Sequence, residues 1–288
     1  MKDDFKKYEF KFLKNAWWNL LWAYKSLFHG QWIEFDEFRE YNIWDPIKNI
    51  DWKRSAKSNK LYIKEFEEER DLSIIFLIDI WKSMKFGSKT KRKLELLKDI
   101  FFSIAFSASK NNDNVWAILY DDEIQRFISP KRGESNILTI INSINELNNK
   151  SYNNSNTSNV ISHINKMNIR NSLLFVLTDD LENIDKNNLK LAWLENDIIY
   201  INIFDYMENN LDPELWDIVL GTWKEKLNIN LKNIEKTEEY RELRMNKILD
   251  FKNKLRKNNI YYIMLDSESN IYQELLRFFL ELTNYKNN

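Results

Sequence analysis

From residue 72 onward, apolar runs of strand length alternate with segments whose apolar residues recur at helical spacing. The runs LSIIFLID (72–79), SLLFVLTDD (172–180) and DIIYINIFD (197–205) are almost continuously apolar and rich in β-branched residues. Such runs are typical of strands buried on both faces. Parallel strands need long crossover connections, so strands that alternate with helices favour a parallel sheet covered on both sides. The pattern predicts an α/β domain with a mostly parallel sheet over residues 71–288.

Further segments complete this alternation. We predict helices over residues 91–110, 134–147, 160–167, 238–255 and 271–282. We predict strands over residues 115–122, 124–129 and 260–265, with a tight acidic turn between the first two. The polar, asparagine-rich segment 148–159 is predicted to be a loop.

Residues 1–70 have a different pattern from the rest of the chain. They are rich in aromatic residues and irregular, with short extended runs such as KLYIKEFEEE (60–69). We predict an N-terminal β-rich arm or small subdomain over residues 1–70, before the α/β domain.

Composition excludes several classes of function. The 43 basic and 44 acidic residues give a net charge of −1, whereas nucleic-acid binding requires a clustered basic surface. The chain has no cysteine, so disulfides and thiolate zinc sites are excluded. Its only histidines are His29 and His163, which argues against histidine metal sites and Ser-His-Asp chemistry.

The sequence shows no targeting or membrane-spanning segment. The most apolar stretch near the N-terminus, AWWNLLWAY (16–24), is far shorter than a membrane span. The opening MKDDFKKYEF lacks the apolar core of a signal peptide. We expect a soluble, cytoplasmic protein; an amphipathic membrane contact around residues 16–28 is the alternative.

Carboxylates and hydroxyls follow the predicted strands at the edge where ligands bind in such sheets. Asp79 ends one strand and Ser83 follows it, Asp179 ends another, and Thr157, with Ser158 as the alternative, lies in the polar loop. Hard oxygen ligands from three loops suit Mg²⁺. The other reading is that these acids only cap the helices that follow.

Phosphate-binding and phosphatase motifs are absent from the sequence. No G-x-x-x-x-G-K-[ST] or G-x-G-x-x-G pattern occurs, so P-loop and dinucleotide functions fail at the motif level. An aspartyl-phosphate phosphatase would carry a second acid two residues after Asp79, and Trp81 stands there instead.

The block YNIWDPIKNIDWKRSAKSNKLYIKEFEEER (41–70) resembles the signature of the bacterial family called domain of unknown function 58. The matching residues are Tyr41, Asp45, Ile50, Asp51, Trp52, Ser55, Ala56, Lys64, Glu65, Glu69 and Arg70. The chain departs from the signature at Lys48 and Lys57, where arginine is usual, and at Trp44, where glycine is usual. The resemblance continues through residues 113–126 and 175–183 and covers most of the chain.

This resemblance implies a von Willebrand factor A-like domain with a metal-ion-dependent adhesion site. On that pattern Asp79 matches the first acid, Ser83 the second serine and Asp179 the third-loop acid. Thr157 is the candidate loop threonine, with Ser158 as the alternative. The resemblance also implies a partner of the MoxR type of AAA+ ATPase, and a metal that bridges to a carboxylate of another protein.

Tryptophan is abundant and glycine is scarce. The chain has 11 tryptophans and 4 glycines, where average usage gives about 20 glycines. Trp81 replaces the first serine of the adhesion site, in the middle of its loop. We hypothesise that UGA codons read as glycine in the living cell stand as tryptophan at Trp32, Trp44, Trp81, Trp116, Trp216 and Trp223. The alternative is that these tryptophans are real and pack a bulky core or an interaction face.

The sequence therefore predicts a non-enzymatic adaptor that works with a MoxR-type AAA+ ATPase or a client protein in assembly or maturation. It uses Mg²⁺ at Asp79, Ser83, Thr157 and Asp179, and it needs no nucleic acid. Two alternatives stay open. One is a metal-dependent hydrolase or phosphotransferase that uses Asp79 and Asp179, and the other is a metal-free interaction scaffold.

Overall fold

The structure is a computed structural model of the chain. It describes residues 6, 8, 18–28, 38–42, 50, 52–57, 60–64, 72–88, 91–148, 155–181, 185–210, 217–221, 226–230 and 234–286.

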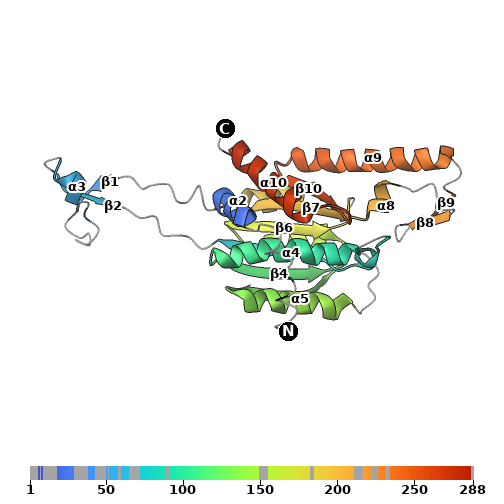
Figure 1. The fold of residues 1–288 in the computed structure, drawn as a ribbon, viewed down its shortest axis with the longest axis horizontal. Coiled ribbons are helices and arrows are strands. Elements are labelled where there is room, and N and C mark those ends of the chain that lie inside the picture. The colour runs from blue at the N-terminus through green and yellow to red at the C-terminus, as the bar shows by residue number, and fades with distance from the viewer. Residues whose placement is uncertain are drawn as a thin grey trace.

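A six-stranded sheet forms the centre of the molecule (Figure 1). Its strand order is β10-β7-β6-β3-β4-β5. The strands are β3 (Ser73–Asp79), β4 (Asn114–Tyr120), β5 (Ile124–Lys131), β6 (Ser172–Thr178), β7 (Asp197–Phe204) and β10 (Tyr261–Asp266). Neighbouring strands are parallel except β5, which pairs antiparallel with β4 because a tight turn joins them.

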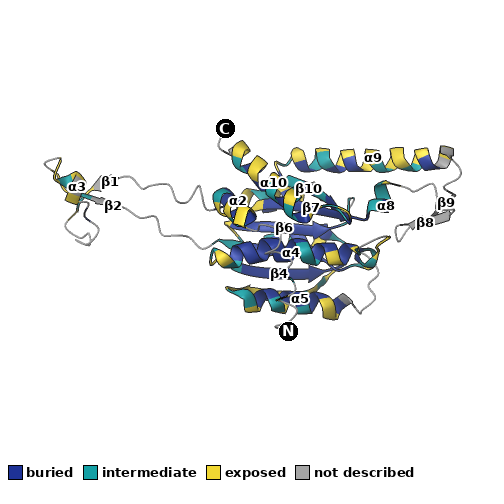
Figure 2. Ribbon diagram, in the orientation of Figure 1, coloured by how far each residue is buried: buried dark blue, intermediate teal, exposed yellow. Residues whose placement is uncertain are grey.

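Helices cover both faces of this sheet. One face packs against α2 (Trp18–Phe28), α4 (Lys93–Lys110), α5 (Glu134–Asn148) and α10 (Ile271–Lys286). The other packs against α6 (Thr157–Lys166), α7 (Lys186–Glu195) and α9 (Ile234–Arg256). Alternate residues of β3 serve the two layers, since Phe76 lies in the first core and Leu77 in the second. Figure 2 shows β4, β6 and β7 buried along most of their length. The edge strand β5 is largely exposed.

The fold class predicted from the sequence is confirmed: the domain is α/β, with a mostly parallel sheet and helices on both faces. Each predicted strand and helix of residues 71–288 is present to within a few residues. The helix expected over 160–167 begins earlier, at Thr157. Its start lies in an asparagine-rich segment, where Asn156 accepts a hydrogen bond from the Asn159 amide at 3.1 Å and so caps the helix.

Several short elements complete the description. A 3-10 turn, η2 (Lys82–Lys85), follows β3, and a short helix, α8 (Tyr206–Asn209), follows β7. Two antiparallel pairs lie outside the central sheet: β1 (Phe38–Glu40) with β2 (Tyr62–Lys64), and β8 (Asp217–Gly221) with β9 (Lys226–Asn230).

The N-terminal region contains both a helix that packs on the domain and a separate strand pair. Figure 1 shows β1, β2 and the short helix α3 (Trp52–Ser55) lying apart from the six-stranded sheet. In contrast, α2 packs against α10 and α4 and contributes Leu20, Tyr24 and Leu27 to the first core. The boundary at residue 70 stays a prediction.

Within the part of the chain that the structure describes, no helix combines the length and the apolar character that crossing a membrane requires.

Candidate functional site

The candidate residues meet at the point where the strand order reverses. From β3 the chain passes to β4 on one side, and later crosses to β6 on the other side. Asp79 is the last residue of β3, and Asp179 directly follows β6, which pairs with β3. Ligands of open α/β sheets bind at the carboxyl ends of strands at such a switch point. The topology therefore brings both acids to the expected edge.

Asp79 is fully buried and receives hydrogen bonds on both carboxylate oxygens. Its Oδ1 accepts from the backbone amide of Trp81 at 2.9 Å. Its Oδ2 accepts from the hydroxyls of Ser155 and Thr178, each at 2.7 Å. Residues from two loops and from the end of β6 thus hold one carboxylate in place.

Burial, followed by the negative charge of Asp179, raises the pKa of Asp79 to about 7. The hydrogen bonds from Thr178, Trp81 and Ser155 act in the opposite direction, because they favour the ionised form. A cation placed beside Asp79 would favour ionisation further. The carboxylate is therefore close to the balance between its protonated and ionised forms near neutral pH.

The Ser83 hydroxyl bears on whether Asp79 and its neighbours could hold a metal ion. Its Oγ is buried and has no hydrogen-bond partner in the described structure. A buried hydroxyl without a partner is destabilising, so an additional ligand is the simplest explanation for it. Together with the Asp79 carboxylate it offers the hard oxygen donors that Mg²⁺ prefers. The chemistry of these oxygen donors fits a small divalent cation.

Trp81 lies beside these donors and contributes no oxygen. Its Nε1 is also buried without a partner among the described residues. Its backbone, with φ −61° and ψ 161°, is extended and accessible to any residue. The conformation of position 81 therefore does not by itself require glycine.

The two hydroxyls predicted for the second loop contact residues other than Asp79. Thr157 is buried at the start of α6, and its Oγ1 pairs with the Tyr120 hydroxyl at 3.0 Å. The Ser158 Oγ accepts from the backbone amide of Asp185 at 2.6 Å. The loop hydroxyl that reaches Asp79 is that of Ser155, which sequence reasoning missed.

Asp179 forms a buried ion pair that no pattern in the sequence predicts. Its Oδ2 lies 2.6 Å from the Nζ of Lys93, which also lies 2.6 Å from Glu208 Oε1. Glu208 in turn pairs with Arg244 at 2.9 Å. Burial lowers the pKa of Lys93, but the charges of Asp179 and Glu208 outweigh this effect and hold it above the ordinary value.

Acidic side chains alone do not make a metal site here. Among the described residues, no group of three or more histidine, aspartate and glutamate side chains is placed to hold a metal. A cation at this edge would depend on hydroxyl ligands, as the sequence predicted. Thr178 could have been suspected because it precedes Asp179 at a strand end, whereas nothing in the sequence marked Lys93.

Of the six anomalous tryptophans, the structure describes Trp81 and Trp116. Trp116 is buried in β4, donates from Nε1 to the Ser73 hydroxyl at 2.9 Å and packs edge-on against Phe127. The sheet thus accommodates this side chain. The remaining four, Trp32, Trp44, Trp216 and Trp223, lie outside the described residues.

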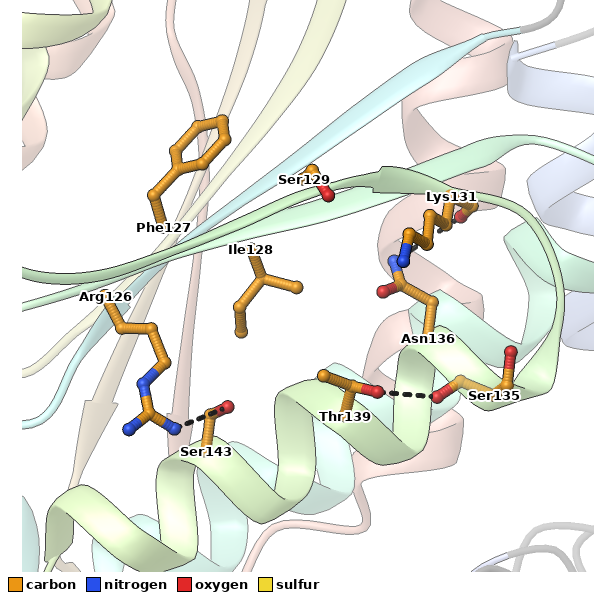
Figure 3. A pocket seen from close by; sticks show the side chains of 9 residues that line it. All are labelled: Arg126, Phe127, Ile128, Ser129, Lys131, Ser135, Asn136, Thr139 and Ser143. Atoms are coloured by element: carbon orange, nitrogen blue, oxygen red, sulfur yellow. Dashed lines mark hydrogen bonds between the residues drawn. The ribbon is translucent and has the colours of Figure 1, made fainter.

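A cavity of about 390 Å³ lies between β5 and α5, and Figure 3 shows the side chains that line it. Within it Arg126 donates to the Ser143 hydroxyl at 3.0 Å and pairs with Glu146 at 2.7 Å. Because β5 forms the sheet edge two strands from β3, this cavity is separate from the carboxylate site.

Comparison with known families and structures gives the following matches. The model of a family described as protein of unknown function DUF58 matches residues 37–246. No curated protein matches the chain.

Three solved structures show a distant likeness. An aerotolerance-related membrane protein from Bacteroides fragilis, solved with multiple mutations to serines, is 14% identical with a TM-score of 0.42, over 74% of this chain and 99% of that one. The VWA domain of SpRpn10 is 12% identical with a TM-score of 0.41, over 71% and 93%. An uncharacterized membrane spanning protein from Vibrio fischeri is 11% identical with a TM-score of 0.25, over 74% and 98%. At this level of likeness, the properties of those proteins do not extend to this chain.

Proposed function

Since the chain belongs to the family described as protein of unknown function DUF58, we propose that it is a non-enzymatic interaction module. It binds another protein at the sheet edge around Asp79, with Mg²⁺ as its cofactor. The observation that carries this proposal is the buried Asp79 carboxylate, which accepts hydrogen bonds from Ser155 and from Thr178 at the end of β6, together with the unpartnered hydroxyl of Ser83 four residues along the chain.

The residues that would hold the cation are Asp79, Ser83 and Asp179, with one hydroxyl of the second loop. Ser155 is supported for that place by its hydrogen bond to Asp79, while Thr157 is the residue that the sequence predicts. When bound, Mg²⁺ would supply a positive charge to a carboxylate of the partner protein. The hydroxyl ligands are neutral, so they leave more of that charge for the partner than carboxylates would.

The partner that the family resemblance implies is a MoxR-type AAA+ ATPase, and we propose that this module links such an ATPase to a client protein. We place the protein in the cytoplasm, where such an ATPase would find it. An adaptor of this kind needs a rigid recognition edge rather than a reactive group. The three hydrogen bonds that fix Asp79 suit that requirement.

The alternative functions make less use of these contacts. A hydrolase or phosphotransferase would need Asp79 or Asp179 to attack or to take a proton. Asp79 instead accepts three hydrogen bonds, and Asp179 is paired with Lys93. A metal-free scaffold would leave the buried Ser83 hydroxyl without a ligand.

Binding of the purified ATPase to the full chain tests the proposal. We expect binding in Mg²⁺ that is lost in EDTA and lost in Asp79→Asn. The matched control is Asp266→Asn, because Asp266 also ends a strand of the same sheet and accepts hydrogen bonds from its own loop. Binding that persists in EDTA and in Asp79→Asn would support the metal-free scaffold, and turnover of a phosphoester lost in Asp79→Asn would support the enzyme.

We also propose that position 81 carries glycine in the cell of origin. Support comes from the scarcity of glycine in the chain and from the unpartnered, buried Nε1 of Trp81 at the edge of the site.

A further inference from the structure

Lys93 places a buried positive charge inside the acidic edge of the sheet. Only 2% of its surface is exposed. Its ammonium group lies 2.6 Å from a carboxylate oxygen of Asp179 and 2.6 Å from one of Glu208. These two acids follow neighbouring strands, β6 and β7. One side chain therefore ties together the carboxyl ends of two strands.

The position of Lys93 is unfavourable apart from these contacts. It is the first residue of α4, where the helix dipole repels a cation. It is also buried, and a buried ammonium is strongly destabilised unless it is paired. Asp179 and Glu208 offset both costs, and Arg244 holds Glu208 in place from α9. Three charged side chains, Asp179, Glu208 and Arg244, thus form a network around this one ammonium group.

The same ammonium group occupies an oxygen of Asp179, an acid that the proposed metal site uses. Asp179 also lies close enough to Asp79 for its charge to raise the pKa of that group. A divalent cation bound at Asp79 would therefore be repelled by the charge of Lys93, and it would compete with Lys93 for Asp179.

We propose that Lys93 is a positioning residue that holds Asp179 and, by its charge, weakens divalent-cation binding at this edge. This inference rests on the proposed function. The site would then fill with metal only at high concentrations, or when a partner carboxylate adds its own negative charge. Lys93 would in this way couple metal binding to partner binding.

Titration of the full-length protein with Mn²⁺, followed by the electron paramagnetic resonance signal of the free ion, tests the inference. We expect Lys93→Gln to bind Mn²⁺ about tenfold more tightly or better, because it removes a charge that acts across a poorly screened interior. Glutamine keeps an amide that can donate to both acids. Lys93→Arg, which keeps the charge, is expected to bind as the wild type does.

The double variant Lys93→Gln/Asp179→Asn distinguishes a positioning role for Lys93 from a purely structural one. If Lys93 acts through Asp179, the gain from Lys93→Gln is largely lost in an Asp179→Asn background. An equal gain in both backgrounds would overturn the positioning role. If Lys93→Gln binds Mn²⁺ with the same affinity as the wild type or more weakly, the whole inference is overturned, although the proposed metal site still stands.

Failure of the proposed metal site would look different, since neither wild type nor Lys93→Gln would then bind Mn²⁺. If Lys93→Gln is unfolded without metal, circular dichroism can follow Mn²⁺ binding instead, because binding of the ion is then coupled to folding. Mn²⁺ is then expected to restore the fold, and a variant that stays unfolded in Mn²⁺ overturns the proposal.

Discussion

Asp79 is the residue at which stability and binding oppose one another. In the metal-free protein, burial and the charge of Asp179 raise its pKa from 3.8 to about 7. A raised carboxyl pKa favours the folded state fully below the unfolded pKa near 4, and this contribution is lost as the pH rises through about 7. The fold thus bears an electrostatic cost at neutral pH that a bound cation would remove.

Asp79→Asn is expected to remove this pH dependence. In EDTA, the free energy of unfolding of the wild type, relative to the variant, should fall between about pH 4 and about pH 7. The size is of order a few kcal/mol, since each pKa unit corresponds to about 1.4 kcal/mol. Urea unfolding across this range measures it. Parallel pH profiles for the two proteins would contradict a raised pKa of the buried Asp79 carboxyl.

Position 81 decides whether the loop beside Asp79 is open. We expect a peptide spanning residues 71–85, taken from the protein made in its own cells, to have the mass that corresponds to glycine at position 81. Glycine would remove an indole whose Nε1 is buried without a partner. Mass spectrometry gives the answer directly. A peptide with tryptophan would show a filled loop, and it would favour the aromatic interaction scaffold.

At the scale of elements, α2 is held to the domain by a buried tyrosine. The Tyr24 hydroxyl donates to Asp113 at 2.8 Å, and both residues are fully buried. Tyr24→Phe removes this donor to a carboxylate, so we expect a loss of about 1–3 kcal/mol in the free energy of unfolding. Tyr285→Phe, on the exposed part of α10, is the control. An equal effect of the two changes would mean that the bond contributes nothing.

The loop before α6 gives a second prediction at this scale, because it presents two hydroxyls to different partners. Ser155→Ala removes a donor to Asp79 and is expected to weaken Mg²⁺ binding at least severalfold. Thr157→Val removes a contact with Tyr120 and none with Asp79 that the structure shows, so it should change binding less. Calorimetric titration with Mg²⁺ compares them. The reverse order would restore Thr157 as the metal ligand.

These elements also show why sequence reasoning succeeded in part. Asp79 and Asp179 were predicted at one edge because strand ends and parallel pairing determine where they lie. The choice between Ser155 and Thr157 depends on the path of the loop, which hydrophobic periodicity does not report.

The scarcity of glycine does not mean that the chain lacks residues able to take positive φ in turns. Four residues with positive φ are asparagines: Asn112, Asn168, Asn171 and Asn259. Asparagine tolerates the left-handed region.

At the scale of the whole molecule, the alternation of strands and helices was enough to predict the sheet and its two covered faces. The helix α7 was missed because its five apolar residues all fall within residues 189–194 and give no clear helical periodicity, and only its Asp185 cap marks its start. Long-range ion pairs could not be predicted at all. Lys93 and Asp179 are 86 residues apart in the chain, so the fold itself creates that contact.

Metal binding is expected to stabilise the whole domain against unfolding. An ion that binds only the folded state stabilises it by mass action, and here it would also relieve the raised pKa of Asp79. We therefore expect Mg²⁺ at about 100 times its dissociation constant to add about 2.7 kcal/mol to the free energy of unfolding. Asp79→Asn should abolish this gain, whereas Asp266→Asn should keep it. Thermal unfolding with and without EDTA measures the effect. A gain that survives in Asp79→Asn would place the bound ion elsewhere on the molecule, and the adaptor would then have to recognise its partner without a metal at this edge.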